Sequence, residues 1–329
     1  MKYKIGITDH IQPPFDFENQ AFPNADFVFL DSTEEGNFCP DTLSELDALI
    51  VWHAEIGELT AKRLSKAKIV VRYGVGFDNI DIQGLNKSHI KFCNTPDYGT
   101  EEVADTASAM ILNLQRKICS YDFACRTYSI GWQGNIQPPI QRTNTQTLGV
   151  IGVGRIGTAL INRMRPFGYR ILGFDPYQPS GHEKAIGYHR EHEISEILAK
   201  SDIISLHCPL NTETKGMVDN HFISKMKPGA ILVNTGRGNV VLDFDCVYHH
   251  LRSGQLGAAA FDVLPIEPPP MNHSLIKAWR NNEEWIAGRL IVNPHTSYYS
   301  EQAVFEMRYK AAETARIFLE KGILRNQVQ

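Results

Sequence analysis

Residues 148–157 read Leu-Gly-Val-Ile-Gly-Val-Gly-Arg-Ile-Gly, and the acidic Asp175 follows eighteen positions after the last glycine. The apolar start of this stretch predicts a strand, and Gly152, Gly154 and Gly157 predict a tight turn into a helix. Such a turn brings backbone N–H groups close to a pyrophosphate at the positive end of the helix, while an acid beyond the next strand accepts from ribose hydroxyls. The order of strand, glycines, helix, strand and acid therefore predicts a dinucleotide site.

The residues around these glycines refine that prediction. Arg155 and Ile156 lie between the second and third glycine, and we expect them to share the cofactor site. A carboxylate at Asp175 would repel the 2′-phosphate of NADP, whereas an arginine there would attract it. The expected cofactor is therefore NAD.

Strands and helices alternate on both sides of this stretch. After it, strands are expected at 148–153, 170–174, 203–206, 230–233, 258–261 and 290–292, with helices at 156–164, 194–200, 221–226 and 244–252. Before it, strands are expected at 4–8, 26–30, 48–52, 68–72 and 90–93, separated by about twenty residues, which leaves room for crossover helices. One long helix is expected over 101–126 with Thr100 as its N-cap, then a polar connector over 131–147, and a last helix over 300–320. This pattern predicts two doubly wound parallel α/β units.

Composition excludes several classes of protein. The 329 residues include 33 Lys and Arg against 37 Asp and Glu, a net charge of −4 that disfavours nucleic-acid binding. No run approaches the ~18 apolar residues of a membrane span, and a charged N-terminus lacks the pattern of a signal peptide, so we expect a cytoplasmic protein. The six cysteines form no CxxC pair, which favours reduced, mostly buried thiols over a disulfide framework or a zinc site.

Polar residues follow most strands of the second half. Because ligands of parallel sheets bind beyond the carboxyl ends of the strands, these residues are candidates for one site. The residues expected to contact the dinucleotide are His207, Cys208, Pro209, Thr235, Gly236, Asp262 and His295. Arg237 and Glu267 are further candidates for the same site.

The first half contains a second glycine turn at a strand end, Arg72-Tyr-Gly-Val-Gly76. Its backbone N–H groups can present an anion site. Taken alone, the turn is equally consistent with a purely structural role. Beside a dinucleotide site, we expect Arg72, Val75 and Gly76 to hold a substrate carboxylate.

Together these motifs resemble the D-isomer-specific 2-hydroxyacid dehydrogenases over nearly the whole chain. Within that family, residues 72–81 and 294–302 are most similar to the C-terminal-binding proteins. The resemblance implies a Rossmann NAD-binding domain, 100–295, inserted into a discontinuous flavodoxin-like substrate domain, 1–99 with 296–329. It also implies a homodimer built with the helix after Thr100, and Arg237, Glu267 and His295 as the catalytic set.

The chemistry of those three side chains suits a small 2-oxo or 2-hydroxy acid. The forked guanidinium of Arg237 can hold the carboxylate and polarise the carbonyl. His295 can protonate the alkoxide formed by hydride transfer, or accept the proton in the oxidative direction. Glu267 would orient the imidazole and keep it protonated. The sequence therefore favours an NAD-dependent oxidoreductase that acts without a catalytic metal.

Some positions depart from the family pattern. Leu242 stands where the family usually has an aspartate, with Asp243 next. Tyr298, which we expect to contact the substrate, stands where the C-terminal-binding proteins place a tryptophan near the substrate. Residues 268–289 lengthen the interval before His295, either as surface packing or as part of the substrate mouth. We interpret His189 and His192, one helical turn apart, as a solvated face and not a metal site.

Two other functions stay open. One is a regulatory protein of the C-terminal-binding type, in which NAD(H) promotes dimerisation and the surface recruits partner peptides. The short segment after the expected last helix favours the enzyme over this regulator. The other is a phosphite-type dehydrogenase, which shares the same catalytic residue types.

Overall fold

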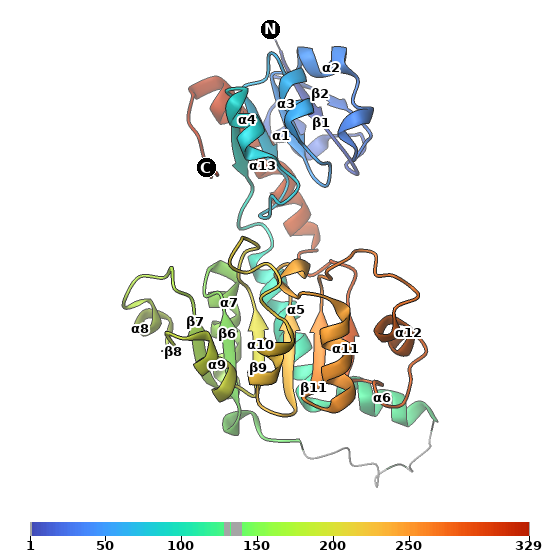
Figure 1. The fold of residues 1–329 in the computed structure, drawn as a ribbon. Helices are drawn as coiled ribbons and strands as arrows, with labels where there is room; N and C mark the ends of the chain where they lie inside the picture. Colours follow the sequence, from blue (N-terminus) through green and yellow to red (C-terminus); the bar gives the residue numbers. More distant parts are fainter. Residues whose placement is uncertain (1, 128–131, 133–139, 329) are drawn as a thin grey trace. The chain divides into compact units, whose positions relative to one another are not determined.

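The computed structural model describes residues 2–127, 132 and 140–328, and its contacts divide the chain into two compact units (Figure 1). The first unit comprises 1–99 and 299–329, and the second comprises 100–298. The division expected from the sequence places residues 296–298 in the first unit instead. Residues 131 and 133–139 of the expected connector over 131–147 lie outside the described residues. Within the described residues, no helix has both the length and the apolar character needed to cross a membrane.

The described part of the first unit contains a five-stranded parallel sheet in the order β2-β1-β3-β4-β5. Its strands are β1 (Tyr3–Ile7), β2 (Ala25–Phe29), β3 (Ala48–Val51), β4 (Ile69–Arg72) and β5 (Lys91–Asn94). The chain order reverses between β1 and β3. The carboxyl ends of these two neighbouring strands are therefore the place where a doubly wound sheet offers a ligand crevice.

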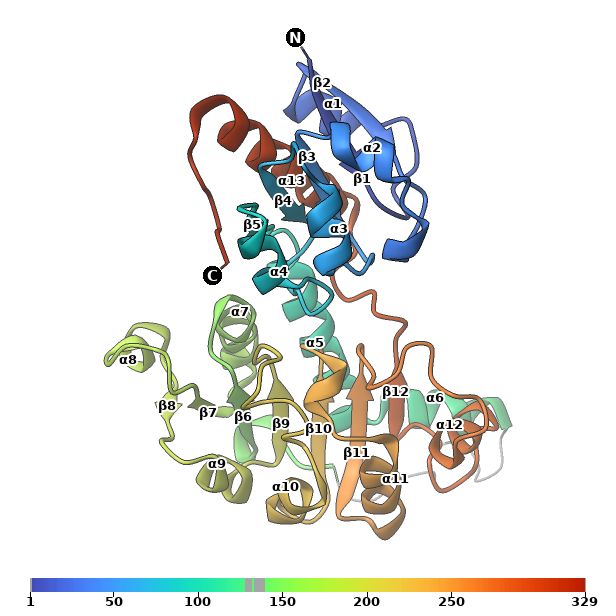
Figure 2. The same cartoon turned by 45° about the horizontal axis from the view of Figure 1, so that its top comes forward.

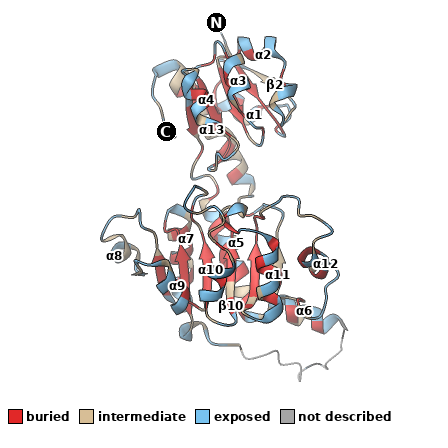
Figure 3. Ribbon diagram, viewed as in Figure 1, coloured by how far each residue is buried: buried red, intermediate tan, exposed pale blue. Residues whose placement is uncertain are grey.

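Helices cover both faces of this sheet. One face packs on α1 (Asp16–Ala21) and α13 (Glu301–Lys321), and the other packs on α2 (Pro40–Glu45), α3 (Glu58–Arg63) and α4 (Ile82–Lys87). Successive strand residues point to opposite faces. Ile50 accordingly belongs to the α13 side, whereas Leu49 and Val51 belong to the α3 side. Burial on both faces explains the continuous apolar runs of the central strands β3 and β4 (Figure 3).

The described part of the second unit contains a seven-stranded parallel sheet in the order β12-β11-β10-β9-β6-β7-β8. The strands are β6 (Thr147–Ile151), β7 (Arg170–Phe174), β8 (His189–Arg190), β9 (Ile203–Leu206), β10 (Ala230–Asn234), β11 (Leu256–Phe261) and β12 (Leu290–Val292). β6 pairs with both β7 and β9, so the strand order reverses beside the glycine turn that follows β6.

Helices also sandwich this second sheet. α5 (Thr100–Arg116) and α7 (Arg155–Met164) cover one face, and α9 (Ile194–Lys200), α10 (Asn220–Lys225) and α11 (Phe244–Ser253) cover the other (Figure 2). α6 (Ile118–Thr127) follows α5, α8 (His182–Ile186) precedes β8, and α12 (Ser274–Arg280) packs beside α11. Short 3₁₀ turns span Glu35–Asn37, Thr143–Thr145, Arg165–Phe167 and Gly238–Val240. Two doubly wound α/β units with a Rossmann-type second unit confirm the predicted fold class.

The single long helix expected over 101–126 is wrong, because the structure has two helices there. Lys117 separates them in the left-handed conformation, with φ +55°. The side-chain oxygen of Asn113 accepts a hydrogen bond of 3.1 Å from the N–H of Cys119 and so caps the start of α6. Neither glycine nor proline marks this break, so helical periodicity alone missed it.

Two further expectations need correction. His189 lies in strand β8, so the helical spacing considered for His189 and His192 does not exist. All six cysteines lie in the described part of the chain as free thiols, but only three of them are buried, and the expectation of mostly buried cysteines was wrong. The exposed ones are Cys39, Cys119 and Cys125.

Residues at or beside positions that depart from the family pattern have clear structural roles. Asp243, one position after Leu242, caps α11 by accepting a 2.8 Å hydrogen bond from the N–H of Cys246. Within residues 268–289, α12 buries Leu275 and Ile276 in the core of the second unit. Arg289 donates to the carbonyls of the neighbouring α11–β11 segment, including that of Gly257 at 2.8 Å. These contacts agree with the packing interpretation of the insertion.

Candidate active site

The glycine turn after β6 has the shape that a pyrophosphate requires. Gly152 has φ +87°, and a Cβ there would lie 2.5 Å from the N atom of Cys208. A Cβ on Gly157 would lie 2.1 Å from the carbonyl oxygen of Gly152, so helix and turn touch at that point. By contrast, a Cβ on Gly154 would meet nothing within 4 Å. The open space at the start of α7 therefore leaves room for a phosphate beside free N–H groups of the first helical turn.

Asp175 ties the glycine turn to the strand beside it. Its Oδ2 accepts a 2.9 Å hydrogen bond from the N–H of Val153, and its Oδ1 accepts one of 3.0 Å from the N–H of Tyr177. A carboxylate has about four lone-pair sites, so capacity for ribose hydroxyls remains. The side chain thus lies at the end of β7, beside the turn, as the sequence predicts.

The turn after β9 holds an uncharged histidine and an uncharged thiol. Nε2 of His207 lies 2.8 Å from Oγ of Ser205, and its Nδ1 lies 3.5 Å from Oγ1 of Thr235. Loss of hydration lowers the pKa of His207 to about 4. Burial raises the pKa of Cys208 to about 11, so its sulfur is a thiol near neutral pH. Pro209 follows on the exposed side of this turn.

The loop that carries Arg237 is shaped by a buried asparagine. Asn234 ends β10 with no exposed surface; its Nδ2 donates to the carbonyl of Arg237 at 3.0 Å, and its Oδ1 accepts from the N–H of Gly236 at 3.0 Å. A Cβ on the next residue, Gly238, would lie 1.8 Å from the carbonyl oxygen of Leu264. This close approach brings the Arg237 loop against the loop that leads to Glu267.

Asp262 holds the turn that carries His295. Its carbonyl accepts from the N–H of His295 at 2.9 Å, and its buried carboxylate accepts from the N–H groups of Thr296 at 2.9 Å and Ser297 at 3.1 Å. His295 itself has φ +57°, an uncommon conformation for a residue with a side chain. The predicted cofactor residue Asp262 therefore fixes a strained turn with its own side chain.

Glu267 and His295 form a direct pair. Nδ1 of His295 lies 2.8 Å from Oε2 of Glu267, whose Oε1 accepts a 2.7 Å hydrogen bond from the N–H of Leu264. Burial acts to raise the pKa of Glu267, but the hydrogen bonds from His295 and Leu264 and the charge of Arg237 outweigh it and lower that pKa. An ionised Glu267 therefore fixes the imidazole while its other nitrogen stays available.

The substrate candidates of the sequence are distributed over both units. Arg72, Val75 and Gly76 lie in the first unit, where Gly74 has φ +120° and Nη1 of Arg72 donates to the carbonyl of Tyr73 at 2.6 Å. Tyr298 is half-buried at the end of the second unit. The second unit also holds the glycine turn, Asp175, Arg237, Glu267 and His295.

Sequence reasoning missed uncharged residues that position the site residues through hydrogen bonds. Ser205 reaches His207 from inside β9, and the backbone N–H of Leu264 supports Glu267. A serine inside an apolar strand is a weak signal for such a contact. A backbone donor leaves no trace in the sequence.

Known proteins are similar to this chain in sequence and in fold. The family model of the D-isomer specific 2-hydroxyacid dehydrogenase, NAD binding domain, matches residues 108–297. A glyoxylate reductase of Korarchaeum cryptofilum is 34% identical over 255 residues, 77% of this chain and 73% of that protein. C-terminal-binding protein 1 of Caenorhabditis elegans is 29% identical over 299 residues, 89% of this chain, which spans 40% of that relative's length. The crystal structure of D-lactate dehydrogenase from Aquifex aeolicus, complexed with NAD and lactic acid, gives a TM-score of 0.82 at 26% identity over 98% of both chains.

Proposed function

Because the chain belongs to the D-isomer-specific 2-hydroxyacid dehydrogenase family, we propose that it transfers hydride between NAD(H) and a small 2-oxo or 2-hydroxy acid, with His295 as general acid and base. The observation that carries this proposal is the 2.8 Å contact between His295 and Glu267, in the same unit as the glycine turn. A histidine oriented by an ionised carboxylate is suited to moving one proton at a carbonyl oxygen.

The residues of the second unit fit NAD as the cofactor. Gly154 leaves open space at the start of α7 for the pyrophosphate, and Asp175 would accept from the adenosine ribose hydroxyls. Arg155, Ile156, Pro209, Thr235 and Gly236 would complete the site. Bound NADH supplies the hydride. The carboxylate of Asp175 favours NADH over NADPH because it repels a 2′-phosphate.

The remaining steps belong to the side chains. Arg237 would hold the substrate carboxylate with its forked donors and polarise the adjacent carbonyl. As negative charge develops on that oxygen, Nε2 of His295 would deliver its proton there, and the charge of Glu267 would stabilise the imidazolium before transfer. In the oxidative direction the neutral imidazole would accept the hydroxyl proton. Arg72, Val75, Gly76 and Tyr298 are our proposed further contacts to the substrate.

The test is NADH oxidation by the purified full chain against a panel of acids graded in size and charge. The panel contains glyoxylate, hydroxypyruvate, pyruvate and phenylpyruvate, with phosphite and NAD tested in the opposite direction. We expect one 2-oxo acid to be clearly preferred. Demonstrable NADH binding without turnover of any 2-oxo acid would refute the proposed activity.

One comparison favours a second candidate function, an NAD(H)-dependent regulatory protein. The 29% identity with C-terminal-binding protein 1 covers 89% of this chain, although the chain spans 40% of that relative. In this function NADH would promote capture of partner peptides and His295→Ala would leave the capture intact. Peptide capture that is lost in His295→Ala, or that is the same with and without NADH, would argue against this second function.

A further inference from the structure

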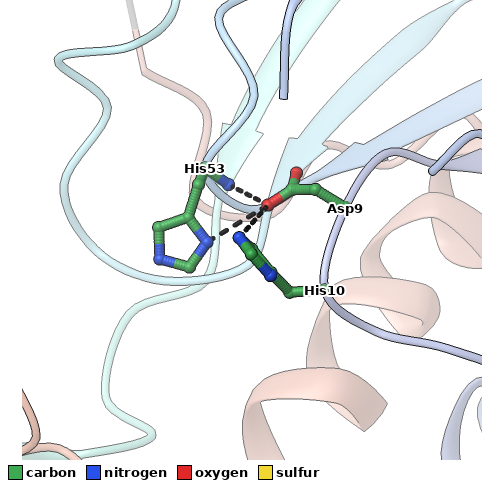
Figure 4. Close-up of side chains that lie close together, drawn as sticks. All are labelled: Asp9, His10 and His53. Atoms are coloured by element: carbon green, nitrogen blue, oxygen red, sulfur yellow. Dashed lines mark hydrogen bonds and ion pairs between the residues drawn. The ribbon is translucent and has the colours of Figure 1, made fainter. Parts of the chain in front are cut away.

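A cluster of three side chains at the switch point of the first unit lies outside the dehydrogenase residues (Figure 4). Asp9 and His10 follow β1, and His53 follows the neighbouring strand β3. We propose that Asp9, His10 and His53 form a binding site for one divalent transition-metal ion of the Zn²⁺ or Co²⁺ type. All three residues belong to the first unit, so the proposal does not rest on the hydroxyacid chemistry.

Asp9 supplies a buried negative charge. Its side chain is 2% exposed, and its oxygens accept hydrogen bonds from the N–H groups of His53 at 2.8 Å and Ala54 at 3.1 Å and from the hydroxyl of Thr8. In each of these hydrogen bonds Asp9 is the acceptor, which is the role that a carboxylate takes.

The partners of this carboxylate are two imidazoles. Within the described residues, the ion-pair partners of Asp9 are His53 and His10, and neither carries a permanent charge. Buried carboxylates are paired with a stable cation or coordinate a metal ion. A divalent cation between the two rings would supply the missing positive charge.

The ligand atoms are already close enough to share an ion. Nδ1 of His53 lies 3.1 Å and Nε2 of His10 lies 3.9 Å from the same oxygen, Oδ2 of Asp9, and the three atoms lie within 4.8 Å of one another. Zinc bonds of roughly 2.0–2.2 Å to nitrogen and oxygen place ligand atoms about 3–4 Å apart. The metal would replace the proton between His53 and Asp9. A small rotation of the His10 side chain would bring its Nε2 to the ion as the third ligand.

The two rings are held in place while their edges remain open to solvent. His53 stacks on Trp52 with centroids 4.8 Å apart, and His10 meets His53 edge-on at 5.0 Å. His10 has φ +55°, a conformation uncommon outside glycine. The side chains of His10 and His53 are 61% and 51% exposed, so an ion can enter and water can fill its remaining positions.

The donor set decides which ion fits. Two imidazole nitrogens and one carboxylate oxygen suit first-row transition ions, whereas Mg²⁺ and Ca²⁺ prefer all-oxygen sites. The sequence gives little sign of this set, because 43 positions separate His10 from His53 and parallel pairing of β1 with β3 brings them together.

In the experiment, a chelator first removes metal from the full chain. The chain is then titrated with Co²⁺, followed by its visible spectrum, and with Zn²⁺, followed by the heat of binding. We expect one ion per chain, resistant to competition by excess Mg²⁺. His10→Ala and His53→Ala should each weaken binding by at least about tenfold, since losing a group that merely orients a ligand costs roughly 10–100-fold. His249→Ala and the pair His189→Ala with His192→Ala serve as controls, because these histidines lie in the second unit.

Binding that is unchanged in the double variant His10→Ala/His53→Ala would overturn the proposal, as would loss of binding in the controls. Failure to bind one ion per chain would overturn it as well. The substituted side chains of His10 and His53 are largely exposed, so these variants should fold. Retained NADH binding would verify that their second unit is folded. Asp9→Asn, which keeps one oxygen for the backbone donors, should also lose the Co²⁺ spectrum.

Discussion

Glu18 and Arg308 lie 290 residues apart in the chain and form a two-point ion pair inside the first unit. Nε of Arg308 lies 2.7 Å from Oε1 of Glu18, and Nη2 lies 2.6 Å from Oε2. The Glu18 side chain has no exposed surface, and its Oε1 also accepts a 2.9 Å hydrogen bond from the buried Tyr73. This pair fastens α13 to α1 and to the residue that precedes the Gly74 turn.

Removing one member of this pair should destabilise the first unit strongly. We expect Arg308→Met to lower the free energy of unfolding by about 3–5 kcal/mol, because it leaves Glu18 buried without its counter-charge. Urea unfolding measures the change. Arg325→Met removes an exposed arginine of the same C-terminal region and should cost less than about 1 kcal/mol. Equal effects of the two substitutions would contradict the structural role of the pair.

Asp175 should set the affinity for NADH and its preference over NADPH. In Asp175→Ala the adenosine ribose of NADH loses a hydrogen-bond acceptor, so the affinity for NADH falls. The 2′-phosphate of NADPH is no longer repelled by a carboxylate, so the difference in affinity between NADH and NADPH becomes smaller. Fluorescence titration with both cofactors measures this. Glu213→Ala, which removes the carboxylate that accepts a hydrogen bond from the hydroxyl of Tyr177, is a matched carboxylate control. Unchanged affinities in Asp175→Ala would remove this residue from the cofactor site.

His207 should make stability depend on pH. Its pKa of about 4 lies below the ordinary 6.5, so between these values the unfolded chain binds a proton that the folded chain does not. Its contribution to stability is therefore lost as pH falls from 6.5 toward 4. The free energy of unfolding is measured with urea at pH values of about 7 and about 4.5. Its decrease between these two pH values should be smaller for His207→Gln than for the unaltered chain. Identical decreases would show that His207 titrates normally.

The homodimer implied by the family resemblance should involve α6. Ile118 and Phe123 on this helix are 56% and 36% exposed, and Phe123 lines an open hollow with Trp279 and Ile286. Contiguous exposed apolar patches mark association surfaces, and these side chains would contribute to such a patch. Light scattering should therefore give a dimer for the unaltered chain and a monomer for Phe123→Glu. An unchanged dimer in Phe123→Glu would place the interface elsewhere, and a monomeric unaltered chain would refute the dimer.

Sequence periodicity predicted the fold because burial on both sheet faces gives the central strands distinct apolar runs. Lys117 shows where this reasoning fails, since a backbone conformation without glycine or proline divides one periodic helix into two. The two-residue strand β8 was missed for a related reason. Its residues His189 and Arg190 are polar, and only pairing with β7 identifies them as a strand.

The candidate site was predictable to the extent that its residues carry recognisable chemistry. The glycine turn and Asp175 were predicted from spacing, and the fixed order of elements brings them together. The 2.8 Å contact of Glu267 with His295 was expected only through the family resemblance. The role of Asp262 in holding the His295 turn, and the meeting of His10 with His53, depend on three-dimensional pairing that no local pattern encodes.

In the proposed function His295 moves the proton while other residues bind the cofactor. The most direct measurement compares turnover and NADH affinity in His295→Ala with the unaltered chain, using the preferred acid of the panel. We predict a fall in turnover of about 10²–10⁴-fold with NADH affinity largely unchanged. Glu267→Gln should reduce turnover in the same direction, because the imidazole loses its ionised partner. Unchanged turnover in His295→Ala would show that this histidine does not move the proton.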